Sequence, residues 1–98
     1  MSEKYPTDDE LKKIVEWVEP WKDWHSFMDY VEELWWMPEW GWGRDGEVYR
    51  ISTGGWSGNE SLIAAMKQNT MFWIMYWYSS RRGGHYIFAP LSEDVEEK

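Results

Sequence analysis

The chain has 98 residues, a net charge of −8, no cysteine and an aromatic content of 19%. This length suits a single domain, and the lack of cysteine excludes disulfide bonds, cysteine-based zinc sites and thiol catalysis. The acidic balance disfavours general DNA or RNA binding, because phosphate neutralisation needs clustered Lys and Arg. We expect one domain over residues 1–90 and an acidic, disordered tail over residues 91–98.

The first forty residues predict two amphipathic helices. Thr7 is a capping residue followed by three acids, and Pro20 ends the apolar repeat that follows. A second helix is predicted from Asp23 to just before Pro38, with His25 on its solvated side. Its apolar stripe consists of Trp24, Phe27, Met28, Val31, Leu34 and Trp35.

Glycine and β-branched residues replace the helical pattern in the next part of the chain. Residues 40–43 read as irregular, and residues 47–53 as a strand. A glycine-rich loop over residues 54–59 then leads into a third predicted helix over residues 60–69. With a hairpin after this helix, the order is ααβαββ. This order predicts an α+β domain of about three helices packed on a small, mainly antiparallel sheet.

The predicted hairpin joins residues 71–82 to residues 85–89 through the two-residue turn Gly83-Gly84. Such a turn pairs Arg82 with His85 and sends alternate side chains to opposite faces. The face with Trp73 and Trp77 is expected in the core, together with Trp24, Phe27 and Leu34. The other face, with Phe72, Ile74 and Tyr76 at its base, needs a helix, a ligand or a second subunit to cover it.

Positive and negative charges are distributed unevenly along the chain. Residues 1–40 carry eleven acids and four lysines, a balance of −7, whereas residues 41–90 carry three acids and five basic residues, a balance of +2. Every arginine lies in the second segment, and arginine presents a planar fork suited to carboxylates and phosphates. We expect the acidic helices to keep a tryptophan-rich protein soluble, and the arginines to mark a functional surface.

The first candidate site is the glycine-rich loop between the predicted strand and the third helix. Free backbone N–H groups and the positive end of a helix dipole suit phosphate or carboxylate. The glycine spacing matches neither a Walker loop nor a dinucleotide fingerprint. Alternatively, Ser57 and Glu60 form a capping box and the glycines only turn the chain. The candidate ligand-binding residues are Gly54, Gly55, Trp56, Ser57, Gly58 and Asn59.

The second candidate site is the tip of the predicted hairpin. Two arginines, a histidine and hydroxyl groups could bind an anion there while a tyrosine stacks on a planar group. Alternatively, the tip is an exposed turn with solubilising charges. The candidate ligand-binding residues are Tyr78, Ser80, Arg81, Arg82, His85 and Tyr86.

Catalytic and metal sites are predicted only weakly. Ser57 stands in a partial nucleophile elbow with His85 as a remote possible base, but Asn59 breaks the pattern and no acid orients the histidine. His25 and His85 lie far apart in sequence without metal-ligand spacing. We therefore expect no enzymatic activity, no cofactor and no bound metal.

Three segments of the second half resemble small, uncharacterised proteins encoded in bacteriophage genomes: Gly-Gly-Trp-Ser-Gly-Asn at 54–59, Met-Phe-Trp at 71–73, and Ser-Arg-Arg-Gly-Gly-His-Tyr at 80–86. The resemblance covers roughly residues 47–88. It assigns no activity to individual residues, and it implies a role against host defences in the host cytoplasm. A cytoplasmic location is also expected because no secretory signal or membrane-spanning run is present.

These patterns favour a non-enzymatic binding protein that sequesters an anionic, nucleotide-like small molecule, with the glycine-rich loop and the hairpin arginines converging on it. A first alternative is an acidic inhibitor that binds a host protein through its helical half and mimics the charge of DNA. A second alternative is an interaction protein whose tryptophan-rich surfaces form a homo-oligomer.

Overall fold

The computed structural model describes residues 4–93 and residue 95. The elements are α1 (Asp8–Val15), α2 (Trp24–Leu34), α3 (Pro38–Gly41), β1 (Trp42–Asp45), β2 (Val48–Ser52), α4 (Ser57–Gln68), α5 (Thr70–Tyr76), β3 (Trp77–Arg81) and β4 (His85–Phe88). The strands form one antiparallel sheet in the order β1-β2-β4-β3. The fold is therefore α+β, as the sequence predicts. Among the described residues, no helix is long and apolar enough to cross a membrane.

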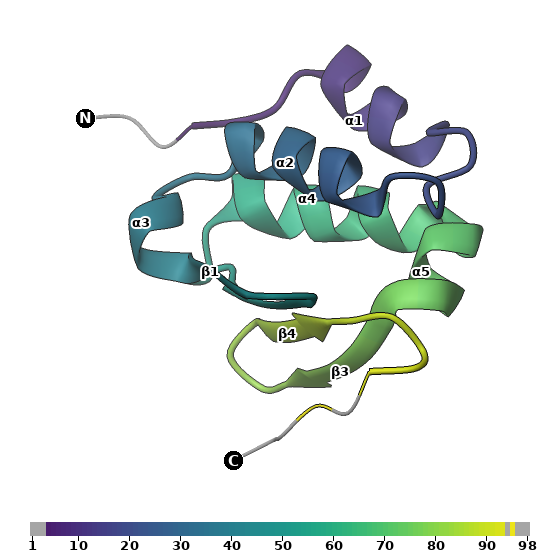
Figure 1. The fold of residues 1–98 in the computed structure, drawn as a ribbon. Helices are drawn as coiled ribbons and strands as arrows, with labels where there is room; N and C mark the ends of the chain where they lie inside the picture. The colour runs from purple at the N-terminus through teal and green to yellow at the C-terminus, as the bar shows by residue number, and fades with distance from the viewer. Residues whose placement is uncertain (1–3, 94, 96–98) are drawn as a thin grey trace.

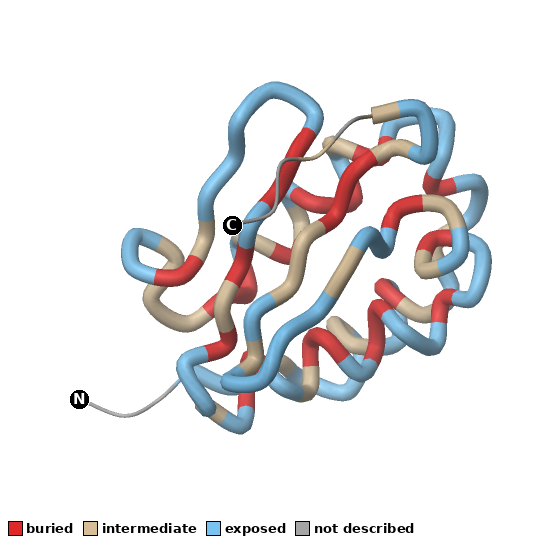
Figure 2. Tube along the Cα trace, turned by 90° about the horizontal axis from the view of Figure 1, so that it is seen from below, coloured by how far each residue is buried: buried red, intermediate tan, exposed pale blue. Residues whose placement is uncertain are grey.

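The helices α1, α2 and α4, here called the helical layer, lie on one side of the sheet (Figure 1). On the sheet face toward this layer, Tyr49 and Ile51 of β2 and Phe88 of β4 are buried. The opposite face, here called the outer face, is seen from its own side in Figure 2. Alternation along β2 thus places Tyr49 and Ile51 on the packed face and Arg50 and Ser52 on the outer face, which also carries Val48.

The core forms where α2 and α5 meet the sheet. Trp24 stacks on Tyr76 with ring centroids 4.4 Å apart, and Phe27 stacks on Phe72 at 4.2 Å. The predicted burial of Trp24, Phe27 and Leu34 is confirmed. Two predicted core residues lie nearer the surface, because Trp73 is half-buried and Trp77 is 39% exposed.

The strand predicted to begin at residue 71 is wrong over its first half, where the chain forms α5. A fully apolar run has no periodicity that separates a helix from a strand. Asn69 decides the outcome: its side chain caps Phe72 N at 3.2 Å and donates to Ile14 O at 3.0 Å and Trp17 O at 3.2 Å. The helix turns Phe72 and Tyr76 into the core.

Because residues 70–76 form a helix, the exposed apolar side chains that could mediate self-association differ from those predicted. Phe72 and Tyr76 belong to the core of their own chain, so they need no second subunit to cover them. The exposed large hydrophobic residues of α5 and β3 are Met71, Ile74, Trp77 and Tyr78. Homo-oligomer formation stays a prediction, with these four side chains as its basis.

The predicted register of the last hairpin is also wrong by one residue at its turn. Arg81, not Arg82, pairs with His85, so the turn contains Arg82, Gly83 and Gly84. The cause is tertiary: the carbonyl of Gly84 accepts a hydrogen bond from Thr53 N at 3.0 Å. A Cβ on Gly84 would collide with the Thr53 side chain, so a glycine is required at this contact.

The segment over residues 40–43 is regular, contrary to the prediction. Residues 38–41 form α3, and Trp42 begins β1, which pairs with β2. Glycines at 41 and 43 hide the strand pattern, because glycine has a low strand propensity. Gly41 is buried, and a Cβ there would press on the carbonyl of Ser52.

Candidate functional site

Arg81, His85 and Ser52 occupy one cross-strand row of the sheet, because Arg81 pairs with His85 on β4 and His85 pairs with Ser52 on β2. Directly paired residues project from the same face of a sheet. Arg81 and His85 are exposed and Ser52 is half-buried, so this row belongs to the outer face. The structure therefore brings two of the predicted anion-binding side chains together with a serine that the sequence did not single out.

A hydrogen bond and a second row complete this cluster. The Ser52 hydroxyl lies 2.6 Å from Nδ1 of His85 and orients the imidazole ring. Arg50 pairs with Ile87 in the neighbouring row, and its side chain is exposed on the same face. We call Arg50, Ser52, Arg81 and His85 the outer-face cluster. Its donors all suit an anionic group.

The glycine-rich loop starts at this cluster, next to the hairpin turn. Thr53 N donates to Gly84 O, and the Thr53 hydroxyl accepts from Gly55 N at 3.2 Å. Gly54 and Gly55 have φ values of 65° and 76°, a region that favours glycine. Trp56 is half-buried and lies against Gly54. The glycine-rich loop and the hairpin tip are therefore adjacent, but the contact between them is a backbone hydrogen bond that holds the loop in place.

The last two residues of the loop stabilise the fold. Gly58 is buried, and a Cβ there would collide with the carbonyl of Lys4. The Asn59 side chain is buried, accepts from Trp36 N at 2.7 Å and donates to Thr53 O at 3.2 Å. Gly58 and Asn59 therefore hold the chain together, and their packing leaves no room for a ligand.

The capping box of Ser57 and Glu60, which was the alternative interpretation of the glycine-rich loop, is absent. Ser57 is the first residue of α4 and Trp56 is its N-cap, with no side-chain hydrogen bond capping the helix. Ser57 is exposed, and the hydroxyl that contacts His85 belongs to Ser52. Among the described residues, no carboxylate bonds to the His85 ring. The geometry thus pairs His85 with a different serine from the one the sequence indicated.

The remaining hairpin residues do not belong to the paired rows of the outer-face cluster. Ser80 pairs with Tyr86, which packs against the core and lines a hollow of about 390 Å³ beside α4. Burial, and then the negative charge of Glu60, raises the pKa of Tyr86. The Tyr78 hydroxyl donates to Val95 O at 3.5 Å, and Arg82 sits in the turn.

A second polar cluster, which sequence reasoning missed, joins α2 to the hairpin of β1 and β2. His25 is half-buried, not on a solvated face: its Nε2 lies 2.8 Å from Glu47 Oε2 and its Nδ1 2.6 Å from the Tyr49 hydroxyl. Trp24 Nε1 donates to Glu47 at 3.2 Å, and Arg44 stacks over the Tyr49 ring. The signal available in sequence was only the alternation that buries Tyr49.

The electrostatics of this second cluster are dominated by burial of its phenol. Tyr49 is 1% exposed, and burial raises its pKa to about 12, against a smaller lowering effect of the Arg44 charge. The Nε2 atom of His25 also lies 3.3 Å from a guanidinium nitrogen of Arg44, so the ring contacts both charged side chains of the cluster. Within the described residues, no group of three or more His, Asp or Glu side chains could hold a metal ion.

Charge is segregated between the two sides of the molecule. The helical layer and its flanks present exposed acids at Asp8, Asp9, Glu16, Glu19, Asp23, Asp29 and Glu33, which outnumber the exposed lysines among them, Lys4, Lys12, Lys13, Lys22 and Lys67. The outer face presents the arginines of β2 and β3. The uneven charge distribution of the sequence therefore becomes a separation in space.

Comparison with known proteins gives no match: no protein family, no curated protein and no solved structure matches the chain. The resemblance of residues 47–88 to small bacteriophage proteins is neither supported nor contradicted by this result. It stays a prediction.

Proposed function

We propose that this protein binds an anionic, nucleotide-like small molecule on its outer face without transforming it. The observation that supports this proposal is the shared row of Arg81, His85 and Ser52, with Arg50 in the next row. Arginine and histidine donate charge-assisted hydrogen bonds, which are about twice as strong as neutral ones. Adjacent strands lie about 4.8 Å apart, so a three-strand row offers donors across roughly 10 Å.

An aromatic surface beside the cluster supports a ligand with a planar part. Trp40 is 61% exposed, and its ring meets that of Trp56 edge-on at 5.7 Å. A Cβ on Gly54 would meet both rings, so they lie close to the start of the glycine-rich loop. The base of a nucleotide could stack on Trp40 while the phosphate of the same nucleotide binds the arginines.

The biological role that we propose is sequestration in the host cytoplasm. The support is the resemblance of residues 47–88 to small bacteriophage proteins together with the anion-binding chemistry of the outer face. Binding without turnover lowers the free concentration of a signalling nucleotide in proportion to the amount of protein. This role needs a ligand site and no catalytic group.

The test is a thermal-shift and calorimetric screen with nucleoside phosphates, cyclic dinucleotides and inorganic phosphate. A bound ligand at about 100 times its Kd should stabilise the fold by about 2.7 kcal/mol. Arg81→Ala and Arg50→Ala should each weaken binding tenfold or more, and Arg81→Lys should restore only part of the affinity. Arg82→Ala makes the same charge change in the turn and is the matched control.

Melting curves of each variant separate lost binding from lost folding. Because Arg50 and Arg81 are exposed, their alanine variants should melt within a few degrees of the parent. The proposal would be overturned by a screen without any ligand, or by arginine variants that bind the ligand as the parent does.

A second function is supported by the charge segregation. We propose that the acidic helical layer binds a positively charged surface of a host protein, in the manner of a DNA mimic. Clustered charge of one sign steers association with an oppositely charged partner, and the effect falls with ionic strength. This function uses a different surface from the nucleotide site, so variants of one surface leave the other intact.

A further inference from the structure

The chain that follows β4 turns back toward β3 (Figure 1). β4 ends at Phe88, and Glu93 N donates to Pro90 O at 3.0 Å, the hydrogen bond of a tight turn. The Tyr78 hydroxyl of β3 donates to Val95 O at 3.5 Å. Glu93 and Val95 are both half-buried, so these two residues contact the rest of the protein.

The direction of this returning segment follows from the strand order. β4 is antiparallel to β3 and runs away from the hairpin turn. A reversal after β4 therefore sends the chain along β3 toward Arg81. Tyr78 and Arg81 are three residues apart, about 10 Å at the rise of a strand. Two extended residues after Val95 cover about 7 Å, and glutamate and arginine side chains are long enough to span the rest.

The returning segment and the outer face have opposite charge. Residues 93–98 contain four acids and one lysine, and the structure describes Glu93 and Val95 of them. The four strands contain three arginines and one acid, Asp45, which lies on β1 at the opposite edge of the sheet from β3. Arg50 and Arg81 are exposed on the outer face. A short tether gives the segment a millimolar effective concentration, so even weak attraction brings it into contact.

We propose that the outer-face cluster binds the acidic segment over residues 93–97 of its own chain. Carboxylates of this segment accept charge-assisted hydrogen bonds from Arg81 and Arg50 in place of an external anion. An anionic ligand has to displace the segment, which lowers the affinity of the outer face and favours phosphates, because their negative charge exceeds that of one carboxylate. This competition rests on the first proposed function, whereas the contact itself does not.

The contact is measured by paramagnetic relaxation of amide signals in solution. The chain contains no cysteine, so Lys98→Cys gives a single attachment point for a spin label and leaves the four acids unchanged. The label should broaden the signals of Ser79, Arg81 and His85 at least twice as strongly as those of α1. This excess should be at least halved when the segment is neutralised by Glu93→Gln, Asp94→Asn, Glu96→Gln and Glu97→Gln.

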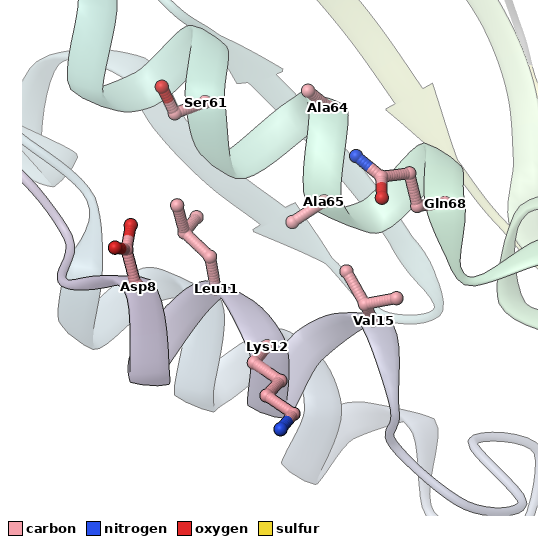
Figure 3. A pocket seen from close by; sticks show the side chains of 8 residues that line it. All are labelled: Asp8, Leu11, Lys12, Val15, Ser61, Ala64, Ala65 and Gln68. Carbon is pink, nitrogen blue, oxygen red and sulfur yellow. The ribbon is translucent and has the colours of Figure 1, made fainter.

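Arg81→Ala and Lys12→Ala form a matched pair, because each removes one exposed positive charge. Lys12 belongs to the helical layer, at the groove between α1 and α4, and its side chain points away from α4 (Figure 3). Arg81→Ala should weaken the broadening on β4, whereas Lys12→Ala should leave it unchanged. Equal effects of the two variants, or no excess broadening in the parent, would overturn the contact. Melting curves confirm that each variant is folded.

Inorganic phosphate is the probe for competition, and its binding is followed through the amide signals of the outer face. The neutralised segment should let phosphate bind at least threefold more tightly than the parent does. The matched control makes the same change in net charge by neutralising four exposed acids of the helical layer: Asp9→Asn, Glu16→Gln, Asp29→Asn and Glu33→Gln. An equal gain in this control would show a long-range effect of net charge and would overturn the competition.

The two measurements distinguish failure of this inference from failure of the proposed function. If phosphate binds the outer face while the label shows no excess contact with β3 and β4, the acidic segment is not its occupant and the anion site stands. If the label shows the contact but phosphate binds neither the parent nor the neutralised variant, the contact stands and the anion site is contradicted.

Discussion

The helical layer and the outer face of the sheet carry opposite charge, and they carry it in different ways. The acids of the helical layer are spread over α1, α2 and the segments beside them, so their electrostatic field covers a large area. The outer-face cluster gathers its donors through strand pairing, which places them in rows of set spacing. The first arrangement suits attraction of a large partner, and the second suits recognition of one anionic group.

The two surfaces depend on a common core, and Trp24 connects them. Its ring is 6% exposed, stacks on Tyr76 and donates to Glu47. Trp24→Ala should lower the free energy of unfolding by about 3–5 kcal/mol, which threatens a domain of this size. Urea unfolding gives the value. Trp40→Ala, at a 61% exposed site, is the control and should cost below about 1 kcal/mol.

A loss below about 1 kcal/mol for Trp24→Ala would show that α2 is only loosely attached to the sheet. The helical layer and the outer face could then move independently, because no shared core would hold them together. Binding of the anionic ligand to the same variant tests this directly, because a folded but loosened chain would keep the outer-face site.

The free energy of unfolding should depend on pH through Tyr49. Burial raises its pKa to about 12, whereas the unfolded chain ionises this phenol near 10. The stability linked to the protonated hydroxyl is complete below pH 10 and is lost as the pH rises from 10 to 12, roughly 2–3 kcal/mol in total. Denaturant unfolding across this range measures it.

Tyr49→Phe is the reference for that measurement. The variant loses the contact with His25, so it should be less stable than the parent at neutral pH. It should lack the Tyr49-linked loss of stability between pH 10 and 12, and the difference between the two proteins should shrink there. Parallel pH profiles would mean that Tyr49 is not buried against α2.

Ser52→Ala should have the smallest effect of the three substitutions and should separate the outer face most cleanly from the helical layer. It removes the hydroxyl that lies 2.6 Å from His85 Nδ1. Stability should change by no more than about 0.5 kcal/mol, because the pair is at the surface. Binding of an anionic ligand should weaken several-fold. Calorimetry gives the affinity, and urea unfolding of the same preparation gives the stability.

The N-terminal helices could be predicted because their signals are local. Thr7 and Glu10 form the reciprocal capping box of α1, and Asp23 caps α2 through Ser26 N. Stripes at helical spacing then predict which side chains are buried, and Trp24, Phe27 and Leu34 are. Neither feature needs information from elsewhere in the chain.

The helix α5 could not be predicted, because its determinants are remote. Its apolar residues satisfy a helix and a strand equally, and Asn69 resolves the choice through hydrogen bonds to residues more than fifty positions earlier. The sequence likewise predicts a ligand contact for the loop residue Asn59, because the hydrogen bond of its side chain with the backbone of Trp36 does not show in sequence.

The sequence by itself determined the α+β class, the two N-terminal helices and the confinement of every arginine to the second half of the chain. Only the tertiary structure decided which arginine joins the outer-face cluster. The hydrogen bond between Thr53 and Gly84 lengthens the hairpin turn by one residue and shifts the register, which pairs Arg81 with His85 and leaves Arg82 in the turn. A one-residue shift changes the face of a strand on which a side chain lies, because alternation along a strand has a period of two.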